Sequence, residues 1–148
     1  GLSHLAKISP DGCSRMLGRT IGGHYGQVPK VAELVLQDKV EAWTLPMGSI
    51  SRMVRAQSTH SPGHITTVGI GTYVDPDQAG GAANELAKTS PLHSQLVSKL
   101  EVQGQTNLMY KALPIDVAII RGTTADMQGN ISVEHESLLC DQKIVAAA

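Results

Sequence analysis

The alternation of strand-like and helix-like segments in the N-terminal half is the feature that most constrains the fold. Residues 15–21 are a strand candidate that ends at a Gly-Gly pair, and residues 29–38 follow with apolar side chains at the spacing of a surface helix. Residues 40–45 predict a second strand and residues 50–59 a second helix, which Ser49 is placed to cap. Strands that alternate with helices are typical of a sheet with helices on its faces. We therefore predict an α/β fold with an open, mostly parallel sheet and flanking helices.

The C-terminal half continues with less regular elements. Four further strand candidates lie at residues 66–70, 95–102, 106–111 and 130–134. Gly104 stands between the middle two and predicts a hairpin, while residues 73–91 are rich in Asp, Pro, Gly and Ala and predict a long surface loop. Residues 115–120 are an apolar run of strand length, which favours a central parallel strand covered on both faces.

Both ends of the chain suggest a piece of a longer protein. The sequence opens at Gly1 without an initiator Met, and residues 138–148 form an apolar, Ala-rich helical run with no Gly, Asn or Pro to end it. We expect residues 1–148 to be one partial domain, truncated at both ends.

Three turns that follow strand candidates predict a ligand site. They contain Gly22, Gly23, His24 and Gly26; Met47 and Gly48; and Gly69, Gly71 and Thr72. In open α/β sheets, ligands bind beyond the carboxyl ends of the strands, and glycine lets a ligand approach the backbone closely. The alternative is that these are ordinary turns.

Other motifs give weaker signals. No phosphate-binding Walker loop is present, and Gly69-Ile70-Gly71 fails as a dinucleotide fingerprint because Val74 stands where a third Gly is required. His60 and His64 have a metal-ligand spacing on a helix, but Pro62 interrupts any helix between them. We therefore predict no metal site, and we favour a solvated or locally hydrogen-bonded histidine pair.

Acidic side chains near the last strand candidates are weak candidates for catalytic groups. Asp116 lies in the apolar run, where a buried acid needs a partner, and a structural role is favoured over a site role. Glu134, His135 and Glu136 are adjacent, but alternation along a strand points the histidine away from the two acids. Asp126 begins a turn signal that ends at Gly129-Asn130.

Composition excludes several partner classes. The formal net charge of −1 gives no reason to expect nucleic acid or an anionic membrane as partner. No apolar stretch approaches the roughly 18–20 residues of a membrane span, and no leader pattern opens the chain. Cys13 and Cys140 are far apart and favour free thiols over a disulfide. These features favour a cytoplasmic protein.

Several short sequence motifs resemble those of one protein family. IGGHYGQVPK at residues 21–30 resembles the GGHxG…PK turn of bacterial propionate and acetate CoA-transferases, and VGIGTYVDP at residues 68–76 is similar to their VGIGTFVDP segment. DVAIIRGT at residues 116–123 resembles their DVALIRGT, and the Ala-Asp-x-x-Gly-Asn of residues 125–130 is shared with succinyl-CoA:3-ketoacid transferases. The chain is therefore similar to the N-terminal domain of a family I coenzyme A transferase.

The resemblance implies a pair of related α/β domains with the active site between them. It also implies a reaction in which a Glu carboxylate attacks an acyl-CoA, forms a glutamyl-CoA thioester and passes CoA to a second carboxylate. Coenzyme A would be a substrate, with no permanently bound cofactor. Short-chain acyl-CoA and carboxylates would be the partners, and a homo-oligomer is expected. The three turns would then lie on the substrate and CoA side of the site.

Two departures from the family pattern limit what the resemblance implies. The family nucleophile is a Glu followed two residues later by Gly in the second domain, and no Glu here has that context, so we expect no catalytic residue in this chain and no activity from it alone. Met47 stands where the family's LPQG turn has a Gln whose amide is thought to hold the thioester oxygen. An acyl-CoA hydrolase and a non-catalytic acyl-CoA-binding or scaffold relative therefore remain alternatives.

Overall fold

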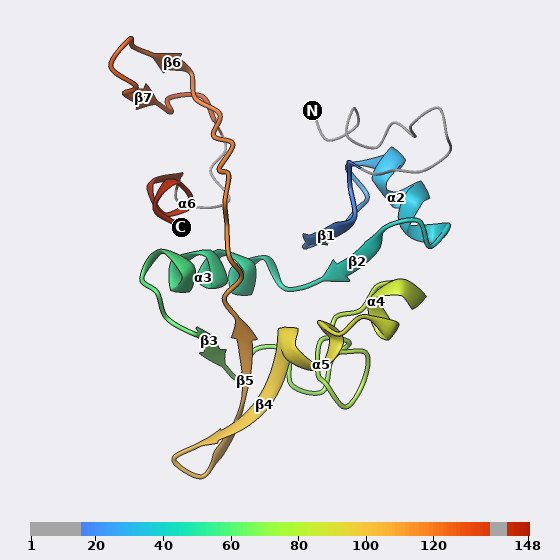
Figure 1. Cartoon of the computed structure of the whole chain (residues 1–148). Helices are drawn as coiled ribbons and strands as arrows, with labels where there is room; N and C mark the ends of the chain where they lie inside the picture. The colour runs from blue at the N-terminus through green and yellow to red at the C-terminus, as the bar shows by residue number, and fades with distance from the viewer. Residues whose placement is uncertain (1–15, 137–141) are drawn as a thin grey trace.

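The computed structural model describes residues 16–136 and 142–148, which form a mixed α/β arrangement of short elements (Figure 1). In chain order these are β1 (Arg19–Gly22), α2 (Pro29–Leu36), β2 (Glu41–Thr44), α3 (Met47–Ser58), β3 (Gly63–Thr66), α4 (Glu85–Thr89), α5 (His93–Leu96), β4 (Val97–Val102), β5 (Gln105–Lys111), β6 (Thr124–Ala125), β7 (Ile131–Ser132) and α6 (Gln142–Ala147). The predicted α/β class is confirmed. The predicted β–α–β–α order of the N-terminal half is also found.

The strands of the described residues form three small sheets, not one open and mostly parallel sheet. β1 and β2 pair in parallel, β3, β5 and β4 form an antiparallel sheet in that order, and β6 pairs antiparallel with β7. The helix α2 provides the crossover that the parallel pair requires, whereas β4 and β5 are joined by a two-residue turn that permits only antiparallel pairing. The predicted hairpin around Gly104 is therefore confirmed.

Two clusters of buried apolar side chains hold these elements together. The helix α2 buries Val31, Leu34 and Val35 against Val40, which precedes β2, and Ala42 of β2. The larger cluster joins β2, α3 and the β4–β5 hairpin and consists of Trp43, Leu45, Met53, Val74, Ala87, Leu92, Leu96, Val97, Leu108 and Tyr110. The chain has no Phe, so aliphatic side chains dominate both clusters.

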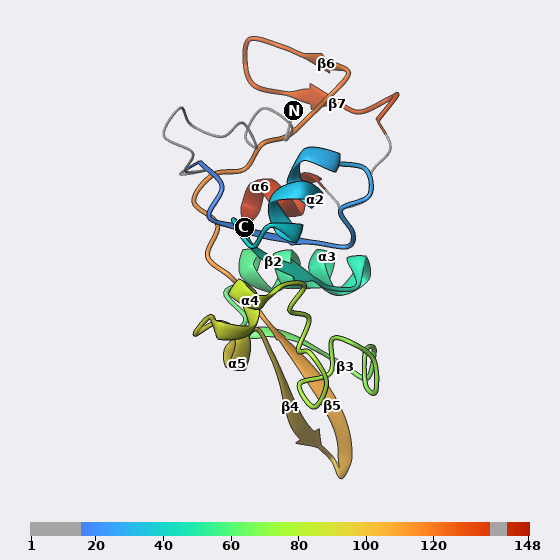
Figure 2. The same ribbon diagram turned by 90° about the vertical axis from the view of Figure 1, so that its right-hand side faces the viewer.

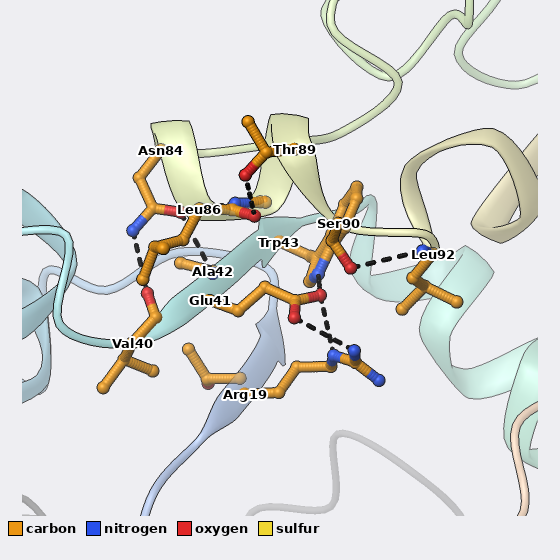
Figure 3. A network of polar contacts seen from close by, with 12 residues as sticks. Arg19, Val40, Glu41, Ala42, Trp43, Asn84, Leu86, Thr89, Ser90 and Leu92 are labelled. Carbon is orange, nitrogen blue, oxygen red and sulfur yellow. Dashed lines mark hydrogen bonds and ion pairs between the residues drawn. The ribbon is translucent and has the colours of Figure 1, made fainter.

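Residues 73–91 are more ordered than a long loop, because polar side chains tie them to β2. The side chain of Asn84 donates to the backbone oxygen of Val40 at 2.8 Å, accepts from the N–H of Ala42 at 3.3 Å, and accepts from Ala87 N as the N-cap of α4 (Figure 3). Asp38, at a φ of 51°, accepts from the N–H of Glu85 at 3.0 Å. The predicted surface loop therefore contains the helix α4, which packs beside β2.

The start of β2 also carries a charged contact with β1. Arg19 donates two hydrogen bonds to the carboxylate of Glu41, at 2.7 and 3.0 Å, and the indole N–H of Trp43 donates to the same carboxylate at 2.8 Å (Figure 3). Partial burial works to raise the pKa of Glu41, but the hydrogen bonds from Arg19 and Trp43 outweigh it, so the pKa lies below its usual value. The pair fixes β1 and β2 in register, with Arg19 opposite Glu41.

Two predicted boundaries are wrong for reasons of backbone geometry. The strand predicted at residues 66–70 lies at Gly63–Thr66, because Gly69 and Gly71 have φ values of 104° and 74° and turn the chain. Ser49 does not cap α3, which begins two residues earlier with Pro46 at the cap position. Ser49 lies inside the first turn of that helix and is only 3% exposed.

The apolar run at residues 115–120 is not a strand in the described residues. It forms part of an extended connection from β5 to β6, and both views show it running alone between them (Figures 1 and 2). Val117 and Ile119 are 78% and 89% exposed, and Asp116 is also exposed. No described strand pairs with this segment, so the predicted burial of Asp116 does not occur.

The chain ends in a small hairpin and a helix. Residues 126–130 form the predicted turn: the carboxylate of Asp126 accepts from the N–H groups of Gln128 and Asn130, and the hairpin of β6 and β7 closes around it. The strand predicted at residues 130–134 is only Ile131–Ser132. The predicted helix at 138–148 is found as α6, Gln142–Ala147, and residues 138–141 lie outside the described residues, as do Cys13 and Cys140.

Candidate functional site

The turns that follow β1 and β2 lie against each other. The two strands run parallel with Gly22 opposite Thr44, and the N–H of Leu45 donates to the oxygen of Gly22 at 3.0 Å. A Cβ added to Gly23 would lie 2.5 Å from the Cγ and Sδ atoms of Met47. The Met47 side chain therefore occupies space that only a glycine at position 23 leaves open.

Tyr25 holds the first of these turns, residues 22–26, onto the parallel pair. Its hydroxyl group lies 2.8 Å from the backbone oxygen of Trp43 and 3.2 Å from that of Thr20. Burial raises the pKa of Tyr25, so the phenol stays protonated and remains a donor. His24 and Gly26 lie on the exposed side of this turn.

The second turn, residues 46–48, opens the helix α3. The first backbone bond of the helix runs from the N–H of Ile50 to the oxygen of Pro46, and no side chain caps it. The preceding N–H groups of Met47 and Gly48 therefore have no acceptor within the helix. Met47 is 44% exposed, and a Cβ at Gly48 would meet no atom within 4 Å. The start of α3 is thus accessible to a ligand.

The third turn, residues 69–72, is held by an internal acid. The carboxylate of Asp75 accepts from the N–H of Gly71 at 2.7 Å and from Asp77 N at 3.1 Å, and it lies 3.0 Å from the ammonium of Lys99, which also pairs with Asp77. Thr72 donates its hydroxyl to the oxygen of Gly69 at 2.8 Å. The Gly71 and Asp77 hydrogen bonds, followed by Lys99, hold the pKa of Asp75 below its usual value.

Tyr110 of β5 connects the third turn to the second. The side chain is fully buried, and its hydroxyl donates to the backbone oxygen of Val68 at 2.8 Å. The hydroxyl oxygen of Tyr110 also accepts a hydrogen bond from the side chain of Ser49, in the first turn of α3. Burial raises the pKa of Tyr110, so the hydroxyl keeps its proton for Val68. The contact between Gly23 and Met47 and the Tyr110 bridge thus link the three predicted turns in a chain.

The structure brings part of the predicted site together, whereas His24, Gly26 and Gly48 remain exposed. Gly22, Gly23 and Met47 meet at the ends of two parallel strands, as predicted. Gly69, Gly71 and Thr72 follow a strand of a different sheet and join through Tyr110 and Asp75.

Sequence reasoning missed Tyr25, Asp75 and Tyr110. Asp75 carried a usable signal, because an acid four residues after Gly71 in a glycine turn can accept its backbone N–H. Tyr110 carried none, since a tyrosine in a strand is an ordinary core residue.

The remaining candidates lie apart from these turns. His60 is exposed at a φ of 54°, and His64 of β3 stacks on Tyr110 with ring centres 6.4 Å apart. Glu136 accepts from the hydroxyl of Thr123 at 2.5 Å, whereas His135 contacts the same hydroxyl only through its backbone N–H. Residues 16–136 and 142–148 contain no cluster of His, Cys, Asp and Glu suited to a metal, and no helix among them is long and apolar enough to cross a membrane.

The structure defines a mixed α/β protein with glycine turns after its strands, and comparison with known proteins makes the assignment specific. Residues 7–148 match the coenzyme A transferase family. The chain belongs to that family.

Individual relatives agree with this assignment. The acetate CoA-transferase YdiF of Escherichia coli K12 is 38% identical over 141 residues, 95% of this chain. The caffeate CoA-transferase of Acetobacterium woodii is 36% identical over 137 residues, 93% of this chain. The acyl-CoA transferase of E. coli O157:H7, solved as an apoenzyme and as a thioester complex with CoA, superposes over the whole chain with a TM-score of 0.85 at 36% identity.

The chain spans about a quarter of the length of these relatives: 26% of the E. coli enzyme, 25% of the caffeate enzyme and 27% of the solved chain.

Proposed function

We propose that this chain is the substrate-side part of an acyl-CoA:carboxylate CoA-transferase that acts through a glutamyl-CoA thioester. The proposal is supported by membership of the family and by the linkage of the three glycine turns. It is also supported by relatives that are named for acetate and caffeate and by a relative solved as a thioester complex with CoA. The nucleophilic Glu is assigned to a part of the protein outside these 148 residues.

The chemistry exchanges one carboxylate for another on the sulfur of CoA. The Glu carboxylate attacks the acyl-CoA carbonyl carbon and expels the CoA thiolate, which leaves a mixed anhydride. The thiolate then attacks the glutamyl carbonyl, so the donor carboxylate departs and glutamyl-CoA forms. Both steps run in reverse with an acceptor carboxylate. In this scheme, residues 22–26, 46–48 and 69–72 surround the acyl and thioester end of the substrate, where glycine permits a close approach.

Because Met47 replaces the family's Gln, the oxyanion that develops on the thioester oxygen would need a different hydrogen-bond donor. Loss of an oxyanion donor typically costs about 10²–10³ in rate, and a thioether offers no N–H. The free N–H groups of Met47 and Gly48 at the start of α3 are suitable replacements, because they point out of the helix and carry its positive end. We propose that these backbone groups take over the role of the missing amide.

Met47 is also the observation that favours a second candidate, an acyl-CoA hydrolase. In that reaction water, in place of an acceptor carboxylate, would attack glutamyl-CoA. The two reactions are separated by measuring CoA release from a full-length protein containing this chain, with and without an acceptor acid. Release that is strictly dependent on the acceptor supports the transferase, whereas release in buffer alone supports the hydrolase.

The main test traps the intermediate. We expect the full-length protein, incubated with acyl-CoA, to form a thioester on Glu that is cleaved by hydroxylamine and reduced by borohydride. Absence of this adduct together with tight acyl-CoA binding would identify a non-catalytic relative. If the adduct forms, Met47→Gln should raise the exchange rate; if it does not form, no exchange should appear in Met47→Gln either.

The role of the turns is tested by a matched pair of glycine variants. Gly23→Ala places a methyl group against the Met47 side chain, and we expect it to lower the exchange rate roughly 10–100-fold through displacement of the turn. Gly18→Ala is the control, because a Cβ there meets no atom within 4 Å. Adding Met47→Ala to Gly23→Ala removes the clashing atoms and should recover part of the loss. Equal effects at positions 18 and 23 would argue against the assigned role.

We also propose that the isolated chain self-associates through its exposed apolar segment. Val117 and Ile119 expose large aliphatic side chains on an unpaired extended backbone, the arrangement that promotes edge-to-edge pairing. Size-exclusion chromatography with light scattering should show oligomers that Ile119→Lys disperses. A monomer at high concentration in both proteins would contradict this.

A further inference from the structure

A basic pocket lies at the junction of α3 and β3, away from the three turns. It has a volume of about 430 Å³ and is lined by Arg52, Arg55, Ala56, Thr59, Ser61, Gly63 and His64. The two arginines are one helical turn apart and point to the same face of α3. Since α3 rises about 1.5 Å per residue, the lining residues lie from about 7.5 Å (Arg52) to about 18 Å (Thr59) along it from Met47. The pocket is therefore separate from the proposed thioester end.

The charge of this pocket is uncompensated. Neither guanidinium group forms an ion pair with an acid anywhere in the described ranges, and no carboxylate is among the lining residues. An unpaired arginine pair beside hydroxyl groups is suited to an anion with several oxygens, because each guanidinium offers up to five N–H donors in a fixed plane.

The local backbone engages only one of these donors: the hydroxyl of Thr59 donates to the oxygens of Arg55 and Ala56, each at 3.2 Å. The end of α3 would repel an anion if its carbonyl groups were exposed. However, the oxygen of Ala56 accepts from the N–H of Ser61 at 2.8 Å, and that of Arg55 accepts from the N–H of Thr59 at 3.2 Å. The Ser61 and Thr59 hydroxyls lie 3.0 Å apart at the rim. Burial, and then the charge of Arg52, lower the pKa of His64, so the free pocket holds a neutral imidazole that can donate one N–H.

We propose that this pocket binds a phosphate monoester carried by a small organic ligand. A phosphate monoester has three terminal oxygens and a charge near −2, which matches two guanidinium groups, the Ser61 hydroxyl and an imidazole better than a carboxylate with two oxygens does. The volume falls within the range of about 300–1,000 Å³ that is usual for small-molecule sites, so the pocket has room for more than the ion. Two sources carry this chemistry: the 3′-phosphate of coenzyme A, and phosphate compounds unrelated to the reaction.

The test is a binding titration on the 148-residue chain, at fixed ionic strength, with three probes: CoA, dephospho-CoA and inorganic phosphate. Binding is followed by calorimetry and by the NMR signals of the arginine side chains and of His64. We expect at least one phosphate probe to bind and to shift the Arg52, Arg55 and His64 signals. Arg52→Gln/Arg55→Gln should weaken binding by at least ~10-fold, because charge-assisted hydrogen bonds are lost. Both arginines are exposed, so circular dichroism should confirm that this variant folds.

The matched control removes the same charge elsewhere. Lys30→Gln/Lys39→Gln changes two exposed lysines around α2 and should leave binding unchanged. CoA binding that exceeds dephospho-CoA binding identifies the 3′-phosphate as the ligand group, and inorganic phosphate binding without that preference identifies a separate phosphate compound; both support the site. Absence of binding by all three probes, or equal weakening in the lysine control, overturns the proposal. Because no step of CoA transfer is measured, the outcome is independent of the proposed function.

Discussion

Residues 16–111 and residues 112–136 differ in the burial of their apolar side chains and in how their strands pair. The first region contains every buried apolar residue of both clusters, and each of its strands pairs with at least one other: β1 with β2, and β5 with both β3 and β4. The second region has no buried residue, and its only strand pairing is the two-residue ladder of β6 and β7. Yet residues 115–120 are among the most apolar stretches of the sequence.

The contrast shows that an apolar segment becomes buried only where neighbouring strands or helices are available to cover it. In the first region, Leu108 and Tyr110 of β5 are paired on both sides by β3 and β4 and lie on the large cluster. In the second region, residues 115–120 have the composition of a central strand but no neighbouring strand among the described residues. The family relatives are about four times longer, and we propose that the missing partner strand belongs to the remainder of such a protein.

The largest effect that tests this comparison is loss of a buried side chain. We expect Leu108→Ala to lower the free energy of unfolding by about 2–5 kcal/mol, because Leu108 is fully buried and a cavity would remain. Ile119→Ala, at a side chain 89% exposed, should change it by less than about 0.5 kcal/mol. Urea titration followed by circular dichroism measures both. A loss at Ile119 comparable to that at Leu108 would mean that the second region is packed.

The fold of the first region was largely predictable because its signals are local. Apolar spacing in α2, proline at its first position and the hairpin around Gly104 each act within a few residues. The wrong start of α3 reflects an interaction at longer range. Ser49 is buried against Tyr110, 61 positions away in the sequence, so its capping preference was overridden.

The candidate site was predictable in its parts and not in its assembly. Glycine turns after strands indicated which residues to compare, and the parallel pair brings Gly23 to Met47 as the strand order implied. The position of residues 69–72 depends on Asp75, Lys99 and Tyr110, and no sequence spacing reveals that these three will meet.

Tyr110→Phe tests the hydroxyl bridge at intermediate magnitude. The ring stays packed, but the backbone oxygen of Val68 and the hydroxyl of Ser49 lose their shared partner, so we expect a loss of about 1–3 kcal/mol in unfolding free energy. Tyr73→Phe is the matched control, since Tyr73 is 49% exposed and should change stability by less than about 0.5 kcal/mol. If both variants unfold at the same urea concentration as the parent chain, the bridge has no energetic role.

The smallest expected effect concerns stability in acid. It tests whether the β6–β7 hairpin unfolds together with residues 16–111 or separately from them. Hydrogen bonds lower the pKa of Asp75 in the first region and, chiefly through Asn130, that of Asp126 in the second. A carboxylate with a lowered pKa stabilises the fold above its unfolded pKa of about 3.9, and this contribution is lost as the pH falls through the folded pKa.

Asp75 holds the 69–72 turn against the large cluster, so its protonation should weaken the whole first region. Asp126 closes only the β6–β7 turn, so its protonation should open that hairpin alone. We therefore expect urea midpoints measured between pH 7 and pH 3 to show a shallower acid decline in Asp75→Asn than in the parent chain, and an unchanged decline in Asp126→Asn. An equal change in both variants would show that the hairpin unfolds together with the core, and that residues 112–136 are coupled to it more closely than their exposure implies.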